Sequence, residues 1–243
     1  MKAIILAAGQ NSRILNIASG LPKTLIKIGS NEILKIILNN LVDIKKINEV
    51  IIVVGYKKQL IKNRFKYSYK NLKIKYISND KYKTTNSMYS LWLTKKFIKN
   101  EMLIINGDTI FSNNFLKDFT NFNANSLIYL DGNTRILNKE SLKVFVSNKL
   151  YAKKIGKNVE KSNKTYGSPA IYIFKGPDLK KFFEVIETKF VLKRKNKYLV
   201  SKAVDSFAKK YQLSAFFSQK NSFWIEIDNS RDYKLAKKMF TNN

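Results

Sequence analysis

The first apolar run of the chain reads Lys2-Ala3-Ile4-Ile5-Leu6-Ala7-Ala8-Gly9-Gln10-Asn11-Ser12-Arg13, in which a hydrophobic stretch leads into small residues, a glycine and an arginine. The hydrophobic part predicts a buried strand. The small residues after it allow the backbone to approach an anion, and the N–H groups of such a loop can point at phosphate oxygens. Arg13 and Lys23 add two cations that could neutralise phosphate charge. We expect a phosphate-binding loop here, and an ordinary strand-to-loop turn is the simplest alternative.

The following residues alternate short apolar runs with segments of helical spacing. Within Glu32–Lys45, apolar residues recur every three or four positions, which gives a helix one buried stripe. This alternation is typical of βαβ units, in which a largely parallel sheet carries helices on its faces. The expected strands are Lys2–Leu6, Glu49–Val54, Leu72–Ile77 and Met102–Ile105, and the expected helices are Glu32–Lys45, Lys57–Phe65 and Asn86–Lys99.

The second half is less regular and predicts a mixed sheet with helices. With 3 prolines, 9 glycines and no internal repeat or low-complexity linker, the chain of 243 residues is expected to form a single domain. The expected strands are Ser126–Leu130, Leu142–Val146, Leu150–Ile155, Ala170–Phe174 and Phe223–Ile227, and the expected helices are Asp178–Thr188, Tyr198–Lys210 and Ser230–Phe240.

The chain is strongly basic, with 46 Lys and Arg against 17 Asp and Glu and a formal net charge of +29. Such a charge raises the prospect of nucleic acid, an anionic membrane or an anionic substrate. However, the lysines are spread among asparagines and isoleucines along the whole chain, as the codon usage of an AT-rich genome would produce. The sequence shows no nucleic-acid-binding module, so we expect a small anionic substrate and no nucleic-acid partner.

Other global features bear on the compartment. No apolar run approaches the roughly 18 residues that a bilayer span needs, and the run at residues 2–8 is too short for a convincing signal sequence. The sequence contains no cysteine, so nothing in it points to an oxidising compartment. We expect a cytoplasmic protein without membrane insertion, as a monomer or a homodimer.

Histidine is absent, which removes the commonest general base and the commonest transition-metal ligand. Carboxylates, lysines and a hard cation must then carry the chemistry. Asp108 follows the expected strand Met102–Ile105, and ligands of open α/β sheets bind at the carboxyl ends of strands. In the late strand, alternation places Glu226 and Asp228 on one face. For any one of these aspartates, a turn or helix cap is the simpler reading.

Two segments together form a recognisable motif: Leu6-Ala7-Ala8-Gly9-x-x-Ser12-Arg13, followed by Leu21-Pro22-Lys23-Thr24-Leu25. They resemble the signature of the nucleoside-triphosphate transferase family, whose members make nucleoside-diphosphate sugars and related activated alcohols. Other segments resemble the family along nearly the whole chain. The resemblance implies a Rossmann-like, GT-A-like α/β fold with a mostly parallel mixed sheet and helices on both faces. Residues 1–120 would form the nucleotide-binding half, and residues 121–243 the acceptor-binding half.

The same resemblance implies roles for individual residues. Asp108 and Asp228 would bind the catalytic Mg²⁺, with Glu226 as an alternative ligand, which agrees with the preference of Mg²⁺ for carboxylates plus substrate phosphates. Lys23 and Arg13 would be catalytic cations. The expected nucleotide-binding residues are Leu6, Ala7, Ala8, Gly9, Gln10, Asn11, Ser12, Arg13, Lys23, Tyr82, Asn86, Ser90 and Gly107.

The stretch from Ser78 to Leu93 resembles the Asn-Asp-x-Tyr … Asn … Ser-Leu pattern of cytidylyltransferases that act on phosphocholine and on small phosphonates. By that resemblance Tyr82, Asn86 and Ser90 would contact base or ribose, and an asparagine offers the donor and acceptor that cytosine requires. For Asn86, a helix N-cap is an equally simple role. We therefore expect CTP as the nucleotide.

The acceptor side resembles the family less closely. Choline-specific relatives surround the trimethylammonium with aromatic and acidic residues. The stretch Glu140–Val144 contains no tryptophan, and the wall Asn196–Ser201 offers Tyr198 but no acid, which argues against phosphocholine. Lys143 and Lys157 lie in Lys-Val and Gly-Lys elements that resemble those of phosphonate- and polyol-phosphate-directed relatives. We expect Lys143, Lys157 and Tyr198 to bind the acceptor, although each lysine could simply be a solvated surface charge.

These observations predict transfer of CMP from CTP to a small phosphate or phosphonate acceptor, with release of pyrophosphate, in support of surface polysaccharide or lipid decoration. An ionised acceptor oxygen needs no general base, which suits a chain without histidine. One alternative is a sugar-1-phosphate nucleotidyltransferase that uses UTP or dTTP. The remote alternative is a basic nucleic-acid-binding domain, which would bind DNA or RNA with a steep salt dependence.

Overall fold

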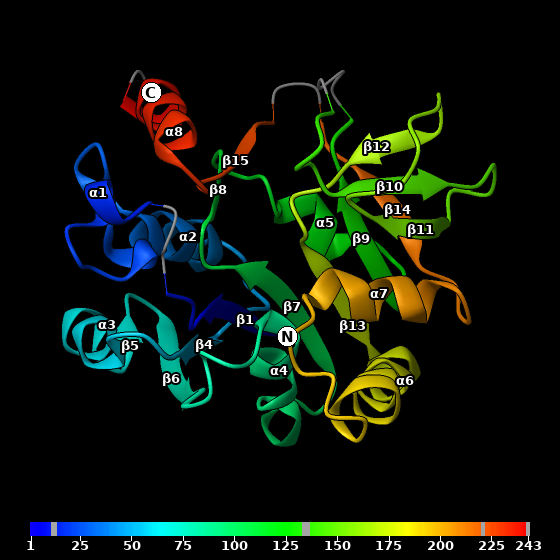
Figure 1. Cartoon of the computed structure of the whole chain (residues 1–243), viewed down its shortest axis with the longest axis horizontal. Coiled ribbons are helices and arrows are strands. Elements are labelled where there is room, and N and C mark those ends of the chain that lie inside the picture. The colour runs from blue at the N-terminus through cyan, green and yellow to red at the C-terminus, as the bar shows by residue number, and fades with distance from the viewer. Residues whose placement is uncertain (11–13, 133–136, 220–221, 242–243) are drawn as a thin grey trace.

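The computed structural model describes residues 1–10, 14–132, 137–219 and 222–241 (Figure 1). The expected loop residues Asn11, Ser12 and Arg13 therefore lie outside the described residues. Among the helices that are described, none combines the length and the apolar character that crossing a bilayer requires.

An eight-stranded sheet forms the centre of the molecule, in the order β14-β9-β13-β7-β1-β4-β6-β5. Strand β1 lies in the interior of the sheet and pairs in parallel with β4 and β7, and β4 pairs in parallel with β6. These four strands are the βαβ part that the sequence predicts. Their bounds are Lys2–Ala7 for β1, Glu49–Val54 for β4, Leu72–Ser78 for β6 and Glu101–Asn106 for β7.

The second half of the chain extends the same sheet with both strand directions. Strand β13 runs antiparallel to β7 and β9, β14 runs parallel to β9, and β5 closes the far edge antiparallel to β6. The expected mixed, mostly parallel sheet is confirmed. The added strands are β5 (Ser68–Tyr69), β9 (Ser126–Leu130), β13 (Tyr172–Lys175) and β14 (Ser214–Phe217).

Three small sheets complete the strands. One is β11-β10-β12, another pairs β15 with β8, and the third pairs β2 with β3. Their bounds are β10 (Lys143–Val146), β11 (Ala152–Gly156), β12 (Thr165–Gly167), β8 (Thr109–Phe111), β15 (Trp224–Glu226), β2 (Lys27–Ile28) and β3 (Asn31–Glu32).

Helices cover both faces of the large sheet, as expected. Alternation along β1 divides the core: Ala3 and Ile5 belong to one hydrophobic cluster, and Ile4 and Leu6 to the other. Residues of α1 (Leu15–Ala18), α2 (Ile33–Val42), α3 (Lys58–Phe65), α5 (Lys117–Asn121) and α8 (Ser230–Thr241) contribute to the first cluster. Residues of α4 (Ser87–Trp92), α6 (Gly176–Ile186) and α7 (Val200–Ala208) contribute to the second.

Several expected boundaries shift for local reasons. The expected helix Asn86–Lys99 breaks after Trp92, where the Thr94 hydroxyl bonds the Leu91 carbonyl at 2.7 Å and a 3₁₀ turn over Lys95–Phe97 follows. Strands β11 and β13 begin two residues later than expected because Leu150 and Ala170 have positive φ angles of 57° and 56°. Helix α6 passes into a π turn over Glu187–Val191.

The antiparallel pairing of β15 with β8 matters most for function. It joins segments more than a hundred residues apart, and the Ile227 N–H donates to the Asp108 carbonyl at 3.0 Å. The Gly107 N–H donates to the Leu6 carbonyl at 2.9 Å, which ties the end of β7 to the end of β1. The ends of β1, β7 and β15 thus meet at one edge of the large sheet.

Gly55, directly after β4, is packed too closely to accept a side chain. A Cβ there would lie 2.6 Å from the Ala8 carbonyl oxygen and 2.8 Å from Tyr82 Cβ. We predict that Gly55→Ala lowers the free energy of unfolding by about 1–3 kcal/mol, as overpacking does elsewhere. Gly156→Ala is the matched control, because a Cβ at Gly156 meets no atom within 4 Å. Equal urea midpoints for the two variants would contradict this prediction.

Candidate active site

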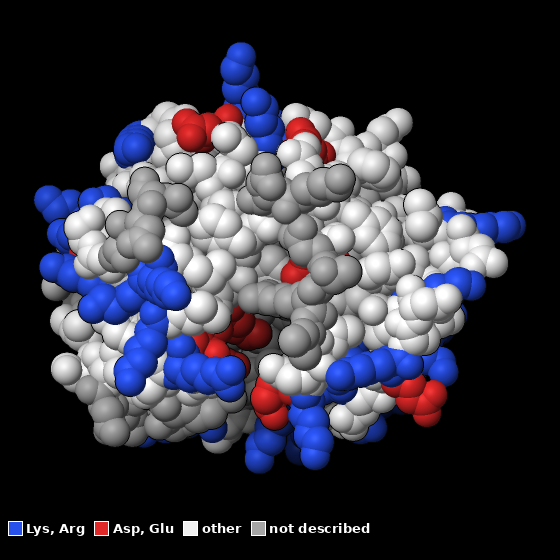
Figure 2. Space-filling view, turned by 90° about the horizontal axis from the view of Figure 1, so that it is seen from above, with Lys and Arg blue, Asp and Glu red and all other residues white. Residues whose placement is uncertain are grey.

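A cleft of about 710 Å³ opens at the carboxyl ends of β1 and β7. Figure 2 shows acidic side chains inside a hollow and lysines and arginines around it. Its walls include the end of β1, the segment between β6 and α4, the end of β7, the residues before and within the first turn of α7, and residues of or next to β13 and β15. In open α/β sheets this edge is where ligands bind.

The cleft gathers nearly all of the residues that the sequence singles out. Each of those that the structure describes lines it, except Lys143. They are Leu6, Ala7, Ala8, Gly9, Gln10, Lys23, Tyr82, Asn86, Ser90, Gly107, Asp108, Lys157, Tyr198, Glu226 and Asp228.

Three carboxylates converge in the cleft: Asp108, Glu226 and Asp228 offer oxygen atoms that all lie within 4.8 Å of one another. Asp108 follows β7, and the pairing of β15 with β8 brings the other two beside it. An oxygen-only set of acidic ligands suits Mg²⁺, which prefers carboxylates and phosphate oxygens. The residues present therefore fit the expected ion.

Lys23 lies between two of these carboxylates. Its Nζ is 2.8 Å from Asp108 Oδ2 and 3.1 Å from Asp228 Oδ1, and only 14% of its side chain is exposed. Burial alone would lower the pKa of the Lys23 ammonium, but the two carboxylates outweigh it and raise that pKa. Lys23 is therefore a fixed cation at neutral pH.

Glu226 faces the opposite situation. Desolvation by the surrounding protein, followed by the negative charges of Asp108 and Asp228, raises the pKa of the Glu226 carboxyl to about 8. The positive charges of Lys23 and Lys157 act to lower this pKa. Its side chain is nevertheless exposed to water in the cleft. Because an exposed carboxyl group is only partly desolvated, we attribute the raised pKa to the neighbouring carboxylates as well as to burial.

Asn79, which begins the Asn-Asp-x-Tyr pattern but was given no role from the sequence, organises the wall next to β6. Its side chain is buried, with Nδ2 donating to Thr85 Oγ1 at 3.0 Å and to Ser90 Oγ at 2.9 Å. Its Oδ1 accepts from the Lys81 N–H at 3.1 Å. Ser90 therefore has its hydroxyl engaged by the protein and supports the wall. Two signals for Asn79 were available: its place in the Asn-Asp-x-Tyr pattern and its position directly after a strand, as for Asp108.

Asn86 caps helix α4, because its Oδ1 accepts from the Ser87 N–H at 2.8 Å. The simpler role considered for Asn86 is thus confirmed, and the residue also lines the cleft. Tyr82 lines it as well and contacts Tyr56 edge to face, with ring centroids 6.3 Å apart.

The acceptor end differs from expectation in two respects. Lys143 is buried and donates from Nζ to the Lys157 carbonyl, so it holds the loop after β11 and does not line the cleft. An acid is present after all: Glu140 lines the same cleft as Tyr198 and pairs with Lys157 Nζ at 2.7 Å. The sequence concealed it because Glu140 and Tyr198 lie far apart along the chain.

A cleft at the carboxyl ends of the strands, with three carboxylates and a largely shielded lysine, suits enzymes that transfer nucleotidyl groups. Residues 2–242 match the family model described as nucleotidyl transferase, and the chain belongs to this family.

Three curated relatives show the range of the family around this chain. Choline-phosphate cytidylyltransferase of Streptococcus pneumoniae is 35% identical over 49% of this chain and 50% of its own length. D-glycero-alpha-D-manno-heptose 1-phosphate guanylyltransferase of Campylobacter jejuni is 39% identical over 46% and 49%. CMP-5'-(3-aminopropyl)phosphonate synthase of Streptomyces rubellomurinus is 31% identical over 46% and 18%. The chain thus spans half or less of the length of these relatives.

The solved structure of the CTP:phosphocholine cytidylyltransferase from Streptococcus pneumoniae has the same fold. It superposes with a TM-score of 0.79 at 24% identity and covers 98% of both chains. The expected nucleotidyltransferase fold is therefore confirmed over nearly the whole chain.

The raised pKa of Glu226 makes a prediction about stability. Without metal or nucleotide, Glu226 in the unfolded chain loses its proton near its ordinary value of 4.5, whereas in the folded protein it keeps it up to about 8. The wild type therefore loses stability relative to Glu226→Gln as the pH rises through that window. We will see this in urea unfolding with a chelator: the free energy of unfolding of Glu226→Gln, relative to that of the wild type, should be higher at about pH 8 than at about pH 5.

The control for this measurement is Glu187→Gln, which removes a surface carboxylate paired with Lys95 at 2.6 Å. An advantage of Glu226→Gln that is the same at both pH values would contradict the raised pKa.

Proposed function

We propose that this protein transfers CMP from CTP to a small phosphate or phosphonate acceptor and releases pyrophosphate. The observation that carries the proposal is the single cleft in which the end of β1, Lys23, the carboxylate cluster and the Tyr82–Ser90 wall meet. The acceptor oxygen attacks the α-phosphorus in line, a new P–O bond forms, and the bond to the β-phosphate breaks. Because the attacking oxygen is already ionised at neutral pH, the reaction needs no general base.

Asp108 and Asp228 would hold Mg²⁺, with Glu226 beside them. When bound, the ion would neutralise charge on the triphosphate and polarise its phosphorus–oxygen bonds. Lys23 supplies a preorganised positive charge near the same phosphates, where charge builds on the leaving group. The backbone of residues 7–10, at the end of β1, lines the cleft where phosphates would lie.

The choice of CTP is supported by the Ser78–Leu93 stretch and by the two relatives named for cytidylyl transfer. For the acceptor, Lys157 offers a cation to a phosphate or phosphonate, and Glu140 lies beside it. Tyr198, 41% exposed, would form part of the same wall. The products would serve surface polysaccharide or lipid decoration, with the protein in the cytoplasm.

The second candidate is a sugar-1-phosphate nucleotidyltransferase. It is favoured by the relative named as a heptose 1-phosphate guanylyltransferase, which is 39% identical over its matched part. Such an enzyme would share the metal carboxylates and Lys23 and would differ in the base and in the acceptor. UTP, dTTP and GTP therefore need to be compared with CTP.

The test is pyrophosphate release with Mg²⁺, using each of the four triphosphates in turn. The acceptors are aminoethylphosphonate, phosphocholine, a polyol phosphate, an amino-acid-derived phosphate and glucose 1-phosphate. The proposal expects CTP to be preferred with a phosphonate or non-sugar phosphate. Preference for another triphosphate with glucose 1-phosphate would establish the second candidate in its place.

We predict that Asp108→Ala lowers turnover with the preferred substrates by about a hundredfold, which corresponds to roughly 3 kcal/mol of transition-state stabilisation. Asp118→Ala, which removes an exposed carboxylate on α5, is the matched control and should retain turnover. Near-normal turnover of Asp108→Ala would exclude Asp108 from the metal site.

A further inference from the structure

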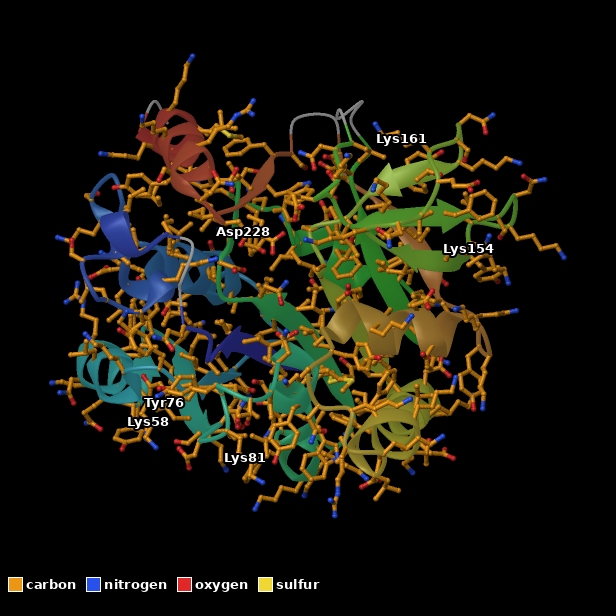
Figure 3. The ribbon with its side chains drawn as sticks, viewed as in Figure 1. Lys58, Tyr76, Lys81, Lys154, Lys161 and Asp228 are labelled. Atoms are coloured by element: carbon orange, nitrogen blue, oxygen red, sulfur yellow. The ribbon has the colours of Figure 1, made fainter. Side chains whose placement is uncertain are left out.

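The Lys23 ammonium occupies the space in which a divalent cation would contact Asp108 and Asp228. It lies at hydrogen-bond distance from both, 2.8 Å and 3.1 Å, and all three side chains are largely shielded from water. Figure 3 labels Asp228, which follows β15 and lines the cleft. A metal ion bound to the same oxygens would be only a few ångströms from the ammonium.

Two cations cannot share these oxygens without a large electrostatic cost. Coulomb repulsion between charges a few ångströms apart is roughly 4 kcal/mol per pair of unit charges at the effective dielectric constant of a partly buried site. The ion pairs that Lys23 makes would also have to break. Without nucleotide, the cleft therefore resists a divalent cation as long as Lys23 stays in place.

A bound triphosphate changes this balance because it offers Lys23 new anionic partners. The Lys23 backbone is fixed in a 3₁₀ turn over Lys23–Leu25, next to the buried Thr24, so the main chain need not move. The side chain ends in a point charge on a flexible four-carbon stem, which can turn toward phosphates without losing its charge compensation. The carboxylates are then left for the metal ion.

We propose that Lys23 keeps the metal-binding carboxylates occupied until a nucleoside triphosphate draws it away, so that metal and nucleotide bind together. This inference rests on the proposed function only in that the ligand is a triphosphate. Reciprocity requires the metal to raise nucleotide affinity by the same factor that the nucleotide raises metal affinity.

The test measures binding of Mn²⁺ alone to the nucleotide-free protein, by the loss of the free-ion paramagnetic resonance signal. We expect weak binding by the wild type and roughly tenfold tighter binding by Lys23→Met, the change that a typical coupling energy produces. Lys154→Met is the control, because Lys154 is exposed on β11, outside the cleft lining (Figure 3). It removes one positive charge from the same basic protein without freeing the carboxylates.

Lys23→Gln provides a second variant, in which a neutral amide can still bond both aspartates, and its Mn²⁺ affinity should also rise. Mn²⁺ should bind more tightly to the wild-type protein together with the α,β-methylene analogue of CTP than to the protein alone or to the analogue alone. Equal Mn²⁺ affinity of the wild type and both Lys23 variants, or a wild type that binds Mn²⁺ equally well with and without the analogue, would overturn the proposal.

The metal-only measurement does not depend on which base or acceptor the enzyme uses. If no triphosphate supports turnover while the Lys23 variants still bind Mn²⁺ more tightly, the proposed function fails and the blocking role of Lys23 stands. If CTP supports turnover and the Lys23 variants bind Mn²⁺ no more tightly than the wild type, the proposed function stands and the blocking role of Lys23 fails.

Discussion

The active cleft depends on keeping three mutually repelling carboxylates within 4.8 Å of one another. Two features make this arrangement stable. The backbone pairing of β15 with β8 fixes the main-chain positions of Glu226 and Asp228. The Lys23 ammonium offsets the negative charges of Asp108 and Asp228. The cost that remains is concentrated on Glu226, whose carboxyl group holds its proton more tightly than an ordinary glutamate. Unfavourable electrostatics of this kind are typical of functional sites.

Much of the fold was predictable because burial leaves a periodic pattern in the sequence. Strands β4 and β9 lie where the apolar runs Glu49–Val54 and Ser126–Leu130 predict them, since both faces of each strand are covered. The errors arose where one residue overrides the pattern. The Thr94 hydroxyl breaks a helix, and Leu150 and Ala170 adopt positive φ without being glycine, which composition does not reveal. Which strands pair as neighbours, such as β13 between β7 and β9, depends on contacts between distant segments.

The candidate site shows the same division. Asp108, Glu226 and Asp228 could be found because each follows or lies in a readable strand, and strand ends meet at one edge of a sheet. Asn79 is defined by its partners Thr85, Ser90 and the Lys81 N–H, and these contacts exist only once the segment has folded. Lys143 turns inward and does not line the cleft, whereas Glu140, to which the sequence assigned no role, does line it. Local sequence does not show which of two nearby polar side chains turns inward. The position of a residue along a strand can be predicted from the sequence, but the role of its side chain in the cleft can be assigned only from the three-dimensional structure.

The order in which the cleft is assembled follows from the pairing of β15 with β8. One wall comes from residues 6–10 and another from residues 226–228, so the site joins parts of the chain separated by more than two hundred positions. During synthesis the parallel strands β1, β4, β6 and β7 can pair long before β15 has left the ribosome, because domains emerge from the amino-terminal side. The carboxylate cluster is therefore complete only after β15 has emerged, and a nascent chain that has folded only β1, β4, β6 and β7 contains Lys23 and Asp108 without Glu226 and Asp228 beside them.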